Sequence, residues 1–228
     1  MDTLRVGGAT ITVEAAEEFI SRYVRNTSRT WSYPAYDAYP GHSGPEVGLA
    51  DIPAIGLLNA GGKAIKTYYG FQELLPLINK KLSDPALHGT LADASAKTLD
   101  AISALYGVLD THRPPEIGLV KLSKVLHRKR PALLPLYDRN ILRCYQEIGI
   151  PAVPYAGKRS TADFMRSWLP VLQQDLVSQL DVWKHLTTLV PNGGHPISPL
   201  RALDMIGWHL GDPRATKSVE KDHSPATY

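Results

Sequence analysis

The sequence predicts an all-α fold, formed by a single helical domain over residues 1–211. Apolar residues recur at spacings of three and four along most of the chain, which places them on one face of a helix. Ser, Thr or Asp, which favour helix N-caps, precede several of these periodic stretches. Alternating polar and apolar runs, which would indicate strands, are scarce.

The helices are predicted from their caps and their periodicity. The first is expected to follow Thr12 and to end near Arg25. Asp51 can cap a second helix, with Pro53 tolerated in its first turn and a glycine pair at 61–62 ending it. The remaining predicted helices span residues 71–82, 91–109, 118–129, 138–148, 161–189 with a break or kink near Pro170, and 198–211.

Two features bear on domain organisation. The Pro-rich stretch 150–155 is either an ordered loop or a hinge, and a hinge would allow two helical lobes, at about 1–112 and 113–211. The segment 212–228 is polar and contains two prolines, so we expect it to be a flexible tail.

Composition limits the class of protein. No apolar run approaches the roughly 20 residues that span a bilayer, and the N-terminus lacks the basic start and apolar stretch of a signal peptide. Cys144 is the single cysteine, which excludes an internal disulfide and a cysteine-based metal cluster. We therefore expect a cytoplasmic protein, monomeric, without a membrane partner, metal or cofactor.

Charge is concentrated in one segment, residues 121–143. It holds seven Lys and Arg residues, and Asp138 is its only acid. Lys121 and Lys124 lie opposite an apolar helical stripe, and Pro131 ends that helix. A cationic surface above a packed face suits a phosphate backbone, so a nucleic acid is the predicted partner. The residues expected to contact phosphates are Arg128, Lys129, Arg130 and Arg139.

The order of elements in this segment resembles a known signature. A turn with Gly118, a helix with lysines near its start, a Pro-containing connection and an Asp that opens the next helix resemble the helix-hairpin-helix DNA glycosylase superfamily, especially its 8-oxoguanine branch. The resemblance covers about thirty residues. It implies that Asp138 is the catalytic carboxylate and that the partner is double-stranded DNA carrying a modified base. Lys121, 17 positions earlier, best matches the nucleophilic lysine of bifunctional members, and Lys124 is the alternative. The usual Gly-hydrophobic-Gly hairpin is reduced to Gly118 alone.

A wider pattern resembles an uncharacterised bacterial family. Its parts are residues 36–41, 124–138 and 199–208, so it covers most of the chain. This second resemblance supplies no activity.

Glycosylase chemistry explains the residue types. Breaking an N-glycosidic bond develops positive charge on the sugar, which a carboxylate stabilises. A lysine attacks only when neutral, so its pKa must be lowered. The target base must leave the stack and enter a pocket. The aromatic residues predicted to line that pocket are Trp31, Tyr33, Tyr36 and Tyr39.

Structural roles compete with each assignment. Asp138 can serve as an N-cap alone, the lysines can form a solvated face, and the aromatic loop can cover the core. Asp204 is expected to pair with Arg201, three residues earlier on a helix. The resulting prediction is a glycosylase that excises an oxidised purine or a hypermodified phage base, in repair or antiviral defence. A non-catalytic DNA-binding module and a helical interaction scaffold are the alternatives.

Overall fold

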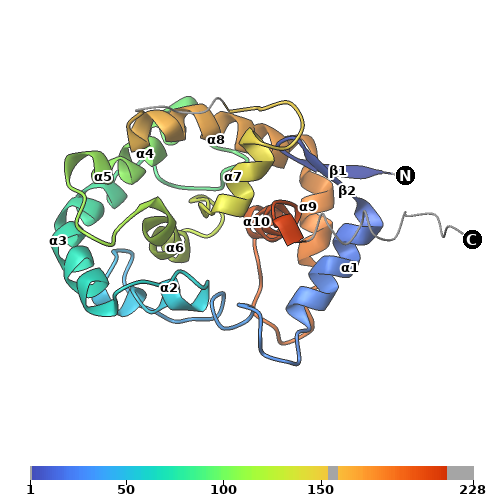
Figure 1. Ribbon diagram of the computed structural model, residues 1–228, viewed down its shortest axis with the longest axis horizontal. Coiled ribbons are helices and arrows are strands. Elements are labelled where there is room, and N and C mark those ends of the chain that lie inside the picture. The colour runs from blue at the N-terminus through green and yellow to red at the C-terminus, as the bar shows by residue number, and fades with distance from the viewer. Residues whose placement is uncertain (1, 154–158, 215–228) are drawn as a thin grey trace, which may run out of the picture.

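The computed structural model describes residues 2–153 and 159–214. Helices hold 54% of the chain, and the described residues contain one two-stranded sheet, so the prediction of a mostly helical protein is confirmed. The elements are β1 (Thr3–Val6), β2 (Ala9–Thr12), α1 (Val13–Val24), a 3-10 turn η1 (Leu49–Asp51), α2 (Ala54–Leu57), α3 (Ala64–Leu82), α4 (Ala96–Tyr106), α5 (Val108–Thr111), α6 (Leu119–Lys129), α7 (Arg139–Gln146), α8 (Thr161–Ser178), α9 (Leu180–Thr187) and α10 (Pro199–Leu210). Figure 1 shows α6 and α10 inside the ring formed by the other helices. No described helix combines the length and the apolar character needed to cross a bilayer.

The N-terminal hairpin is absent from the predicted elements. β1 and β2 pair antiparallel, with Leu4 opposite Ile11. The turn between them needs a glycine at position 7, where φ is +60° and a Cβ atom would lie 2.2 Å from the Cys144 carbonyl oxygen. The Gly7 N–H donates to Asp175 Oδ2 at 2.7 Å, so the turn joins the hairpin to α8.

Helix starts follow the predicted caps more closely than helix ends do. The Thr12 side chain accepts from Ala15 N at 3.2 Å and begins α1 as predicted. The helix predicted over 161–189 does break, but at Gln179 rather than near Pro170, which lies inside α8. The Gln179 side chain accepts from Arg5 N at 2.8 Å and donates to Arg5 O at 3.0 Å. A contact with β1 therefore marks the break.

Three other predicted elements have different bounds. The second predicted helix is a 3-10 turn followed by the short α2, and α3 begins at Ala64 instead of at 71. The helix predicted over 91–109 begins at Ala96 as α4 and is interrupted at Gly107, before α5. Of the predicted tail, the structure describes Asp212 to Arg214, and the rest lies outside the described residues. Residues 150–153 form an irregular segment, and the remainder of the predicted hinge, 154–155, also lies outside them.

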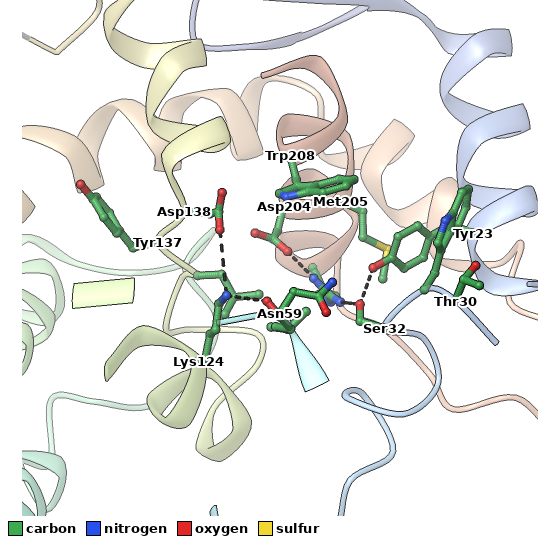
Figure 2. A pocket seen from close by; sticks show the side chains of 14 residues that line it. Tyr23, Thr30, Ser32, Asn59, Lys124, Tyr137, Asp138, Asp204, Met205 and Trp208 are labelled. Carbon is green, nitrogen blue, oxygen red and sulfur yellow. Dashed lines mark hydrogen bonds and ion pairs between the residues drawn. The ribbon is translucent and has the colours of Figure 1, made fainter. Parts of the chain in front are cut away.

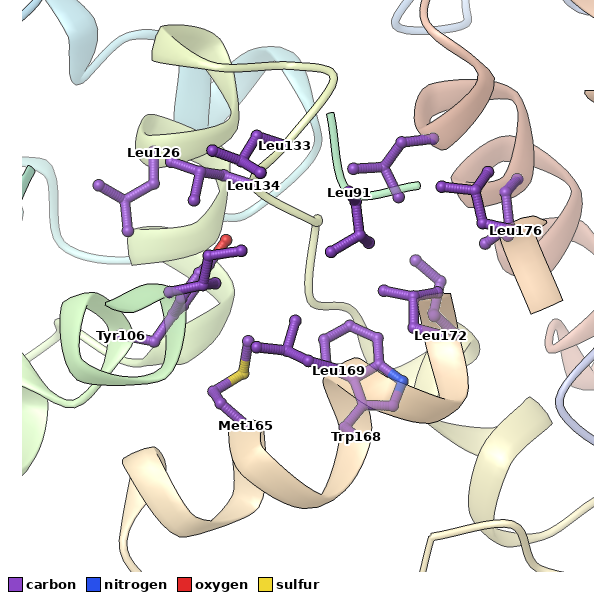
Figure 3. Close-up of a cluster of buried hydrophobic side chains, with 14 of the residues drawn as sticks. Leu91, Tyr106, Leu126, Leu133, Leu134, Met165, Trp168, Leu169, Leu172 and Leu176 are labelled. Atoms are coloured by element: carbon purple, nitrogen blue, oxygen red, sulfur yellow. The ribbon is translucent and has the colours of Figure 1, made fainter. Parts of the chain in front are cut away.

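One hydrophobic core joins both predicted lobes. It extends in sequence from Leu4 to Ile206 and includes residues from each half of the chain. In Figure 3, Trp168 and Leu169 of α8 face Tyr106 of α4 and Leu126 of α6 across the core. All four side chains are almost completely buried.

Helix α6 is buried on every side. Its residues from Lys121 to His127 are all buried, including the two lysines. The Tyr36 hydroxyl donates to the Lys124 carbonyl at 2.7 Å, which places the loop after α1 against the helix. The alternative that these lysines form a solvated face is therefore wrong, because distant segments cover that face.

Candidate active site

A cavity of about 210 Å³ lies where α6, the start of α7 and α10 meet the loop after α1. Its lining comprises Tyr23, Thr30, Trp31, Ser32, Leu58, Asn59, Lys124, Leu136, Tyr137, Asp138, Arg201, Asp204, Met205 and Trp208. Figure 2 shows Lys124, Asp138 and Asp204 around this cavity, with Trp208 at its edge. Three of the residues singled out from the sequence, Asp138, Lys124 and Trp31, therefore line one cavity.

Asp138 has two separate environments for its two carboxylate oxygens. Oδ1 accepts a hydrogen bond from Asn140 N at 3.0 Å, which caps α7. Oδ2 lies 4.0 Å from Lys124 Nζ, and the side chain is 28% exposed. The cap thus uses one oxygen and leaves the other in the cavity.

Lys124 is almost fully buried, and its ammonium group is fixed in place. Nζ donates to the Leu58 carbonyl at 2.7 Å. Burial lowers the pKa of Lys124, and the carboxylates of Asp138 and Asp204 partly oppose that shift. A lysine in this environment loses its proton more readily than one in water.

A buried ion network forms the inner wall of the cavity. Arg201 Nε donates to Asp37 Oδ1 at 2.8 Å, and Arg201 Nη1 pairs with Asp204 Oδ2. The predicted pairing of Arg201 with Asp204 is therefore confirmed, and Asp37 is a further partner. Burial raises the pKa of Asp204 to about 6, although Arg201 acts in the opposite direction.

His127 lies buried on α6, close to this network. Its Nδ1 lies 2.7 Å from the Leu134 carbonyl oxygen, at hydrogen-bonding distance. Burial, together with the positive charge of Arg201, lowers the pKa of His127 to about 4. The imidazole is therefore neutral at physiological pH.

Lys121 lies one turn before Lys124 but lines a different groove, of about 900 Å³, beside α2 and the start of α3. Its Nζ donates to Thr67 Oγ1 at 2.8 Å and lies 3.7 Å from a carboxylate oxygen of Glu116. The structure brings Lys124 to Asp138, and it places Lys121, the better match by sequence, elsewhere.

The basic run at 128–130 holds loops together. All three side chains donate to main-chain carbonyl groups far away in sequence. Their acceptors are the carbonyl oxygens of Asp37 and Tyr39 for Arg128, of His42 for Lys129, and of Leu82 and Leu87 for Arg130. Lys129 also forms an ion pair with the buried Asp51, at 2.9 Å. The terminal guanidinium groups and the ammonium group are therefore already engaged, although Arg128 Nε is buried without a hydrogen-bond partner among the described residues. Arg139, in the first turn of α7, is exposed.

Three of the four predicted pocket aromatics act as anchors instead. The hydroxyl groups of Tyr33 and Tyr39 donate to the carbonyls of residues 195 and 50, at 2.9 and 3.0 Å. Tyr36 is fully buried and donates to α6. The aromatic residues that line the cavity but were not predicted are Tyr23, Tyr137 and Trp208. A sequence signal for Trp208 existed, since it lies four residues after Asp204 on the same helical face.

Among the described residues, no group of His, Cys, Asp and Glu side chains is arranged to hold a metal ion. A protein-family model matches residues 16–211, which include all fourteen cavity residues. The chain belongs to DUF6308, a family of unknown function. No curated protein and no solved structure gives a significant match. For this DUF6308 chain, the cavity is the feature that points to a function.

Proposed function

We propose that this chain is a DNA N-glycosylase that takes a damaged or modified base into the cavity and cleaves its N-glycosidic bond. The observation that carries the proposal is the meeting of Asp138 and Lys124 at one aromatic-lined cavity. The two residues come from different helices, and both types are those that the reaction uses.

The size and lining of the cavity favour a single heterocycle. Its volume of about 210 Å³ is below the roughly 300–1,000 Å³ of sites for drug-sized ligands. Trp31, Tyr137 and Trp208 provide aromatic surface, and Trp208 is 39% exposed. Enzymes that act on a base in DNA move it out of the stack into a pocket of this kind.

Asp138 is the proposed electrostatic catalyst. As the bond to the base breaks, positive charge develops on the sugar, and the cavity-facing Oδ2 stabilises it. Two nucleophiles are compatible with the site. One is a water molecule that loses its proton to Asp138, and the other is the neutral amine of Lys124, which burial favours.

The local architecture supports the helix-hairpin-helix assignment. Along the chain, the short α5 is followed by a turn at 112–118 and by α6, and Gly118 is the N-cap of α6. Asp138 then begins α7, as the catalytic carboxylate does in the resemblance. The proposed fold is therefore a glycosylase-like helical domain, with Lys124 in the place first assigned to Lys121.

The proposed substrate is duplex DNA that carries an oxidised purine or a hypermodified base of the kind found in phage genomes. The protein would act as a cytoplasmic monomer, in repair or in antiviral defence. The polar floor of the cavity, formed by Arg201 and Asp204, offers hydrogen-bonding groups to the edge of such a base.

The test is base excision from a panel of duplexes, each with one modified base, followed by alkaline cleavage of the abasic sites. Asp138→Asn is the decisive variant, because Asn caps a helix as well as Asp does but carries no charge. We expect normal folding and a loss of excision of about 10²–10⁴-fold.

Lys121→Gln is the control for a buried charge outside the cavity, since Lys121 lies on the same helix as Lys124 and lines a different groove. It should retain excision. An Asp138→Asn protein that excises its base at the wild-type rate would overturn the catalytic assignment.

A further inference from the structure

A second hollow lies next to the cavity, at the C-terminal end of α1. It is an open surface depression of about 600 Å³. The side chains that matter in it are Arg22, Arg25, Asn26, Thr27, Ser28 and Trp31. Trp31 lines both the hollow and the cavity, so the indole forms a shared wall. A chain that passes from the cavity over Trp31 enters this hollow.

The hollow has free positive charge. Arg22 and Arg25 are exposed, and the neighbouring Arg29 is exposed as well. Within the described part of the chain, no hydrogen bond or ion pair engages their guanidinium groups; Arg22 lies over the Trp31 ring, 5.7 Å from its centroid. Glu18 is the acid that lines the hollow. The N–H donors of these guanidinium groups are unpaired within the described residues, whereas the terminal groups of Arg128, Lys129 and Arg130 donate to main-chain carbonyls.

The polar groups of the hollow suit a phosphate group. Arg22 and Arg25 are exposed and match its charge, and hydrogen bonds from arginine to phosphate are among the strong, charge-assisted ones. Ser28 also lines the hollow, where its Oγ donates to Asn26 Oδ1 at 2.5 Å.

We propose that this hollow, and not the run at 128–130, binds the phosphate backbone of the DNA strand whose base occupies the cavity. The occupancy of the cavity rests on the proposed function. The positive charge and the shared indole are properties of the hollow itself. Arg22 and Arg25 hold phosphates, and the Trp31 indole, over which Arg22 lies, separates them from the cavity.

The test compares two double variants with equal loss of charge. Arg22→Gln with Arg25→Gln removes the proposed contacts. Lys80→Gln with Lys81→Gln, at the exposed C-terminal end of α3, is the control. Binding of a fluorescent duplex is measured by anisotropy at several salt concentrations, and circular dichroism checks folding.

Each phosphate contact contributes about 0.9 to the slope of log affinity against log salt. The arginine variant should therefore lose about 1.8 from the slope and bind at least about tenfold more weakly at low salt, and the lysine variant should match wild type.

The outcomes separate the two proposals. If the arginine variant has the same affinity and salt dependence as the lysine control, the hollow is not the phosphate-binding site, whatever the excision assay shows. If DNA binding depends on Arg22 and Arg25 but the wild-type protein excises no base, the result supports the phosphate-binding site and counts against the glycosylase activity. A wild-type protein that does not bind duplex DNA overturns both.

Discussion

Replacing Lys129 by Met should destabilise the fold, because this lysine balances a buried carboxylate. Lys129 Nζ lies 2.9 Å from Asp51 Oδ2 and donates to the His42 carbonyl at 2.8 Å. The Asp51 side chain is 2% exposed. Without the ammonium group, the Asp51 carboxylate stays buried and has lost its cationic partner. Removing one partner of a buried ion pair typically lowers the free energy of unfolding by about 3–5 kcal/mol.

The expected magnitude is at the lower end of that range. Asp51 keeps two main-chain donors, His42 N at 3.0 Å and Gly48 N at 2.8 Å, which still stabilise its charge. We therefore expect the free energy of unfolding to fall by about 3 kcal/mol. For a chain of 228 residues this corresponds to a fall in Tm of roughly 6–12 °C.

The assay is thermal and urea unfolding of four proteins: wild type, Lys129→Met, Asp51→Asn and the double variant. The double variant should be less destabilised than the sum of the two single variants, since it leaves no unpaired charge. A Lys129→Met protein that melts within about 2 °C of wild type would refute the reasoning. In that case Lys129 would be free to contact DNA, as the sequence first suggested.

Three further predictions follow from the site. If Lys124 is the nucleophile, borohydride should trap a covalent protein–DNA adduct, which Lys124→Gln abolishes and Lys121→Gln keeps. Because the pKa of Lys124 is lowered, trapping should increase with pH at a midpoint below 10.5. If a substrate is excised but no adduct can be trapped, water is the nucleophile. Folding lowers the pKa of His127 from 6.5 to about 4, so the unfolded chain binds a proton at this residue before the folded protein does. As pH falls from 6.5 to 4, the free energy of unfolding of wild type should therefore drop by about 3 kcal/mol more than that of His127→Asn. Urea unfolding at a series of pH values measures this, and the same pH dependence in both proteins would contradict it. Arg201→Met should lower the free energy of unfolding by about 3–5 kcal/mol, because the two carboxylates that Arg201 bridges remain buried; an unchanged urea midpoint would exclude that role.

The parts of the fold that depend on local sequence could be predicted. Helix starts at Thr12, Asp138 and Ser198 are set by side chains that accept from nearby N–H groups. The hairpin at residues 3–12 was missed although its signal is local. Gly7 and Gly8 between two short β-branched stretches are typical of a two-residue turn.

The choice between the two lysines could not be made from the sequence. Lys121 and Lys124 are one turn apart on α6, and both face segments that are distant in the chain. The spacing of 17 residues to Asp138 favoured Lys121. The position of α7 relative to α6 decides the matter, and it depends on core packing rather than on spacing.

The role of the basic run was hidden for a related reason. Cations near the end of a helix often bind main-chain carbonyls, and the run at 128–130 ends α6 just before Pro131. The carbonyl acceptors, however, come from residues 37–42 and 82–87, which are far away in the sequence, so the sequence does not identify them. A count of charges along the chain does not show which guanidinium groups are already occupied. Counting charges therefore predicted phosphate contacts for the run at 128–130 and predicted none for Arg22 and Arg25.

Capping and catalysis are not competing explanations of Asp138. The cap needs a single acceptor, and Oδ1 supplies it to Asn140 N. Asn would cap α7 equally well, so the cap gives no reason for a charged residue at this position. A charge at a helix N-terminus contributes only a few tenths of a kcal/mol to about 1 kcal/mol. What an Asp adds is an anionic oxygen that faces the cavity 4.0 Å from Lys124 Nζ. This second oxygen, oriented by the cap on the first, is the group that would stabilise positive charge on the sugar in the proposed glycosylase reaction.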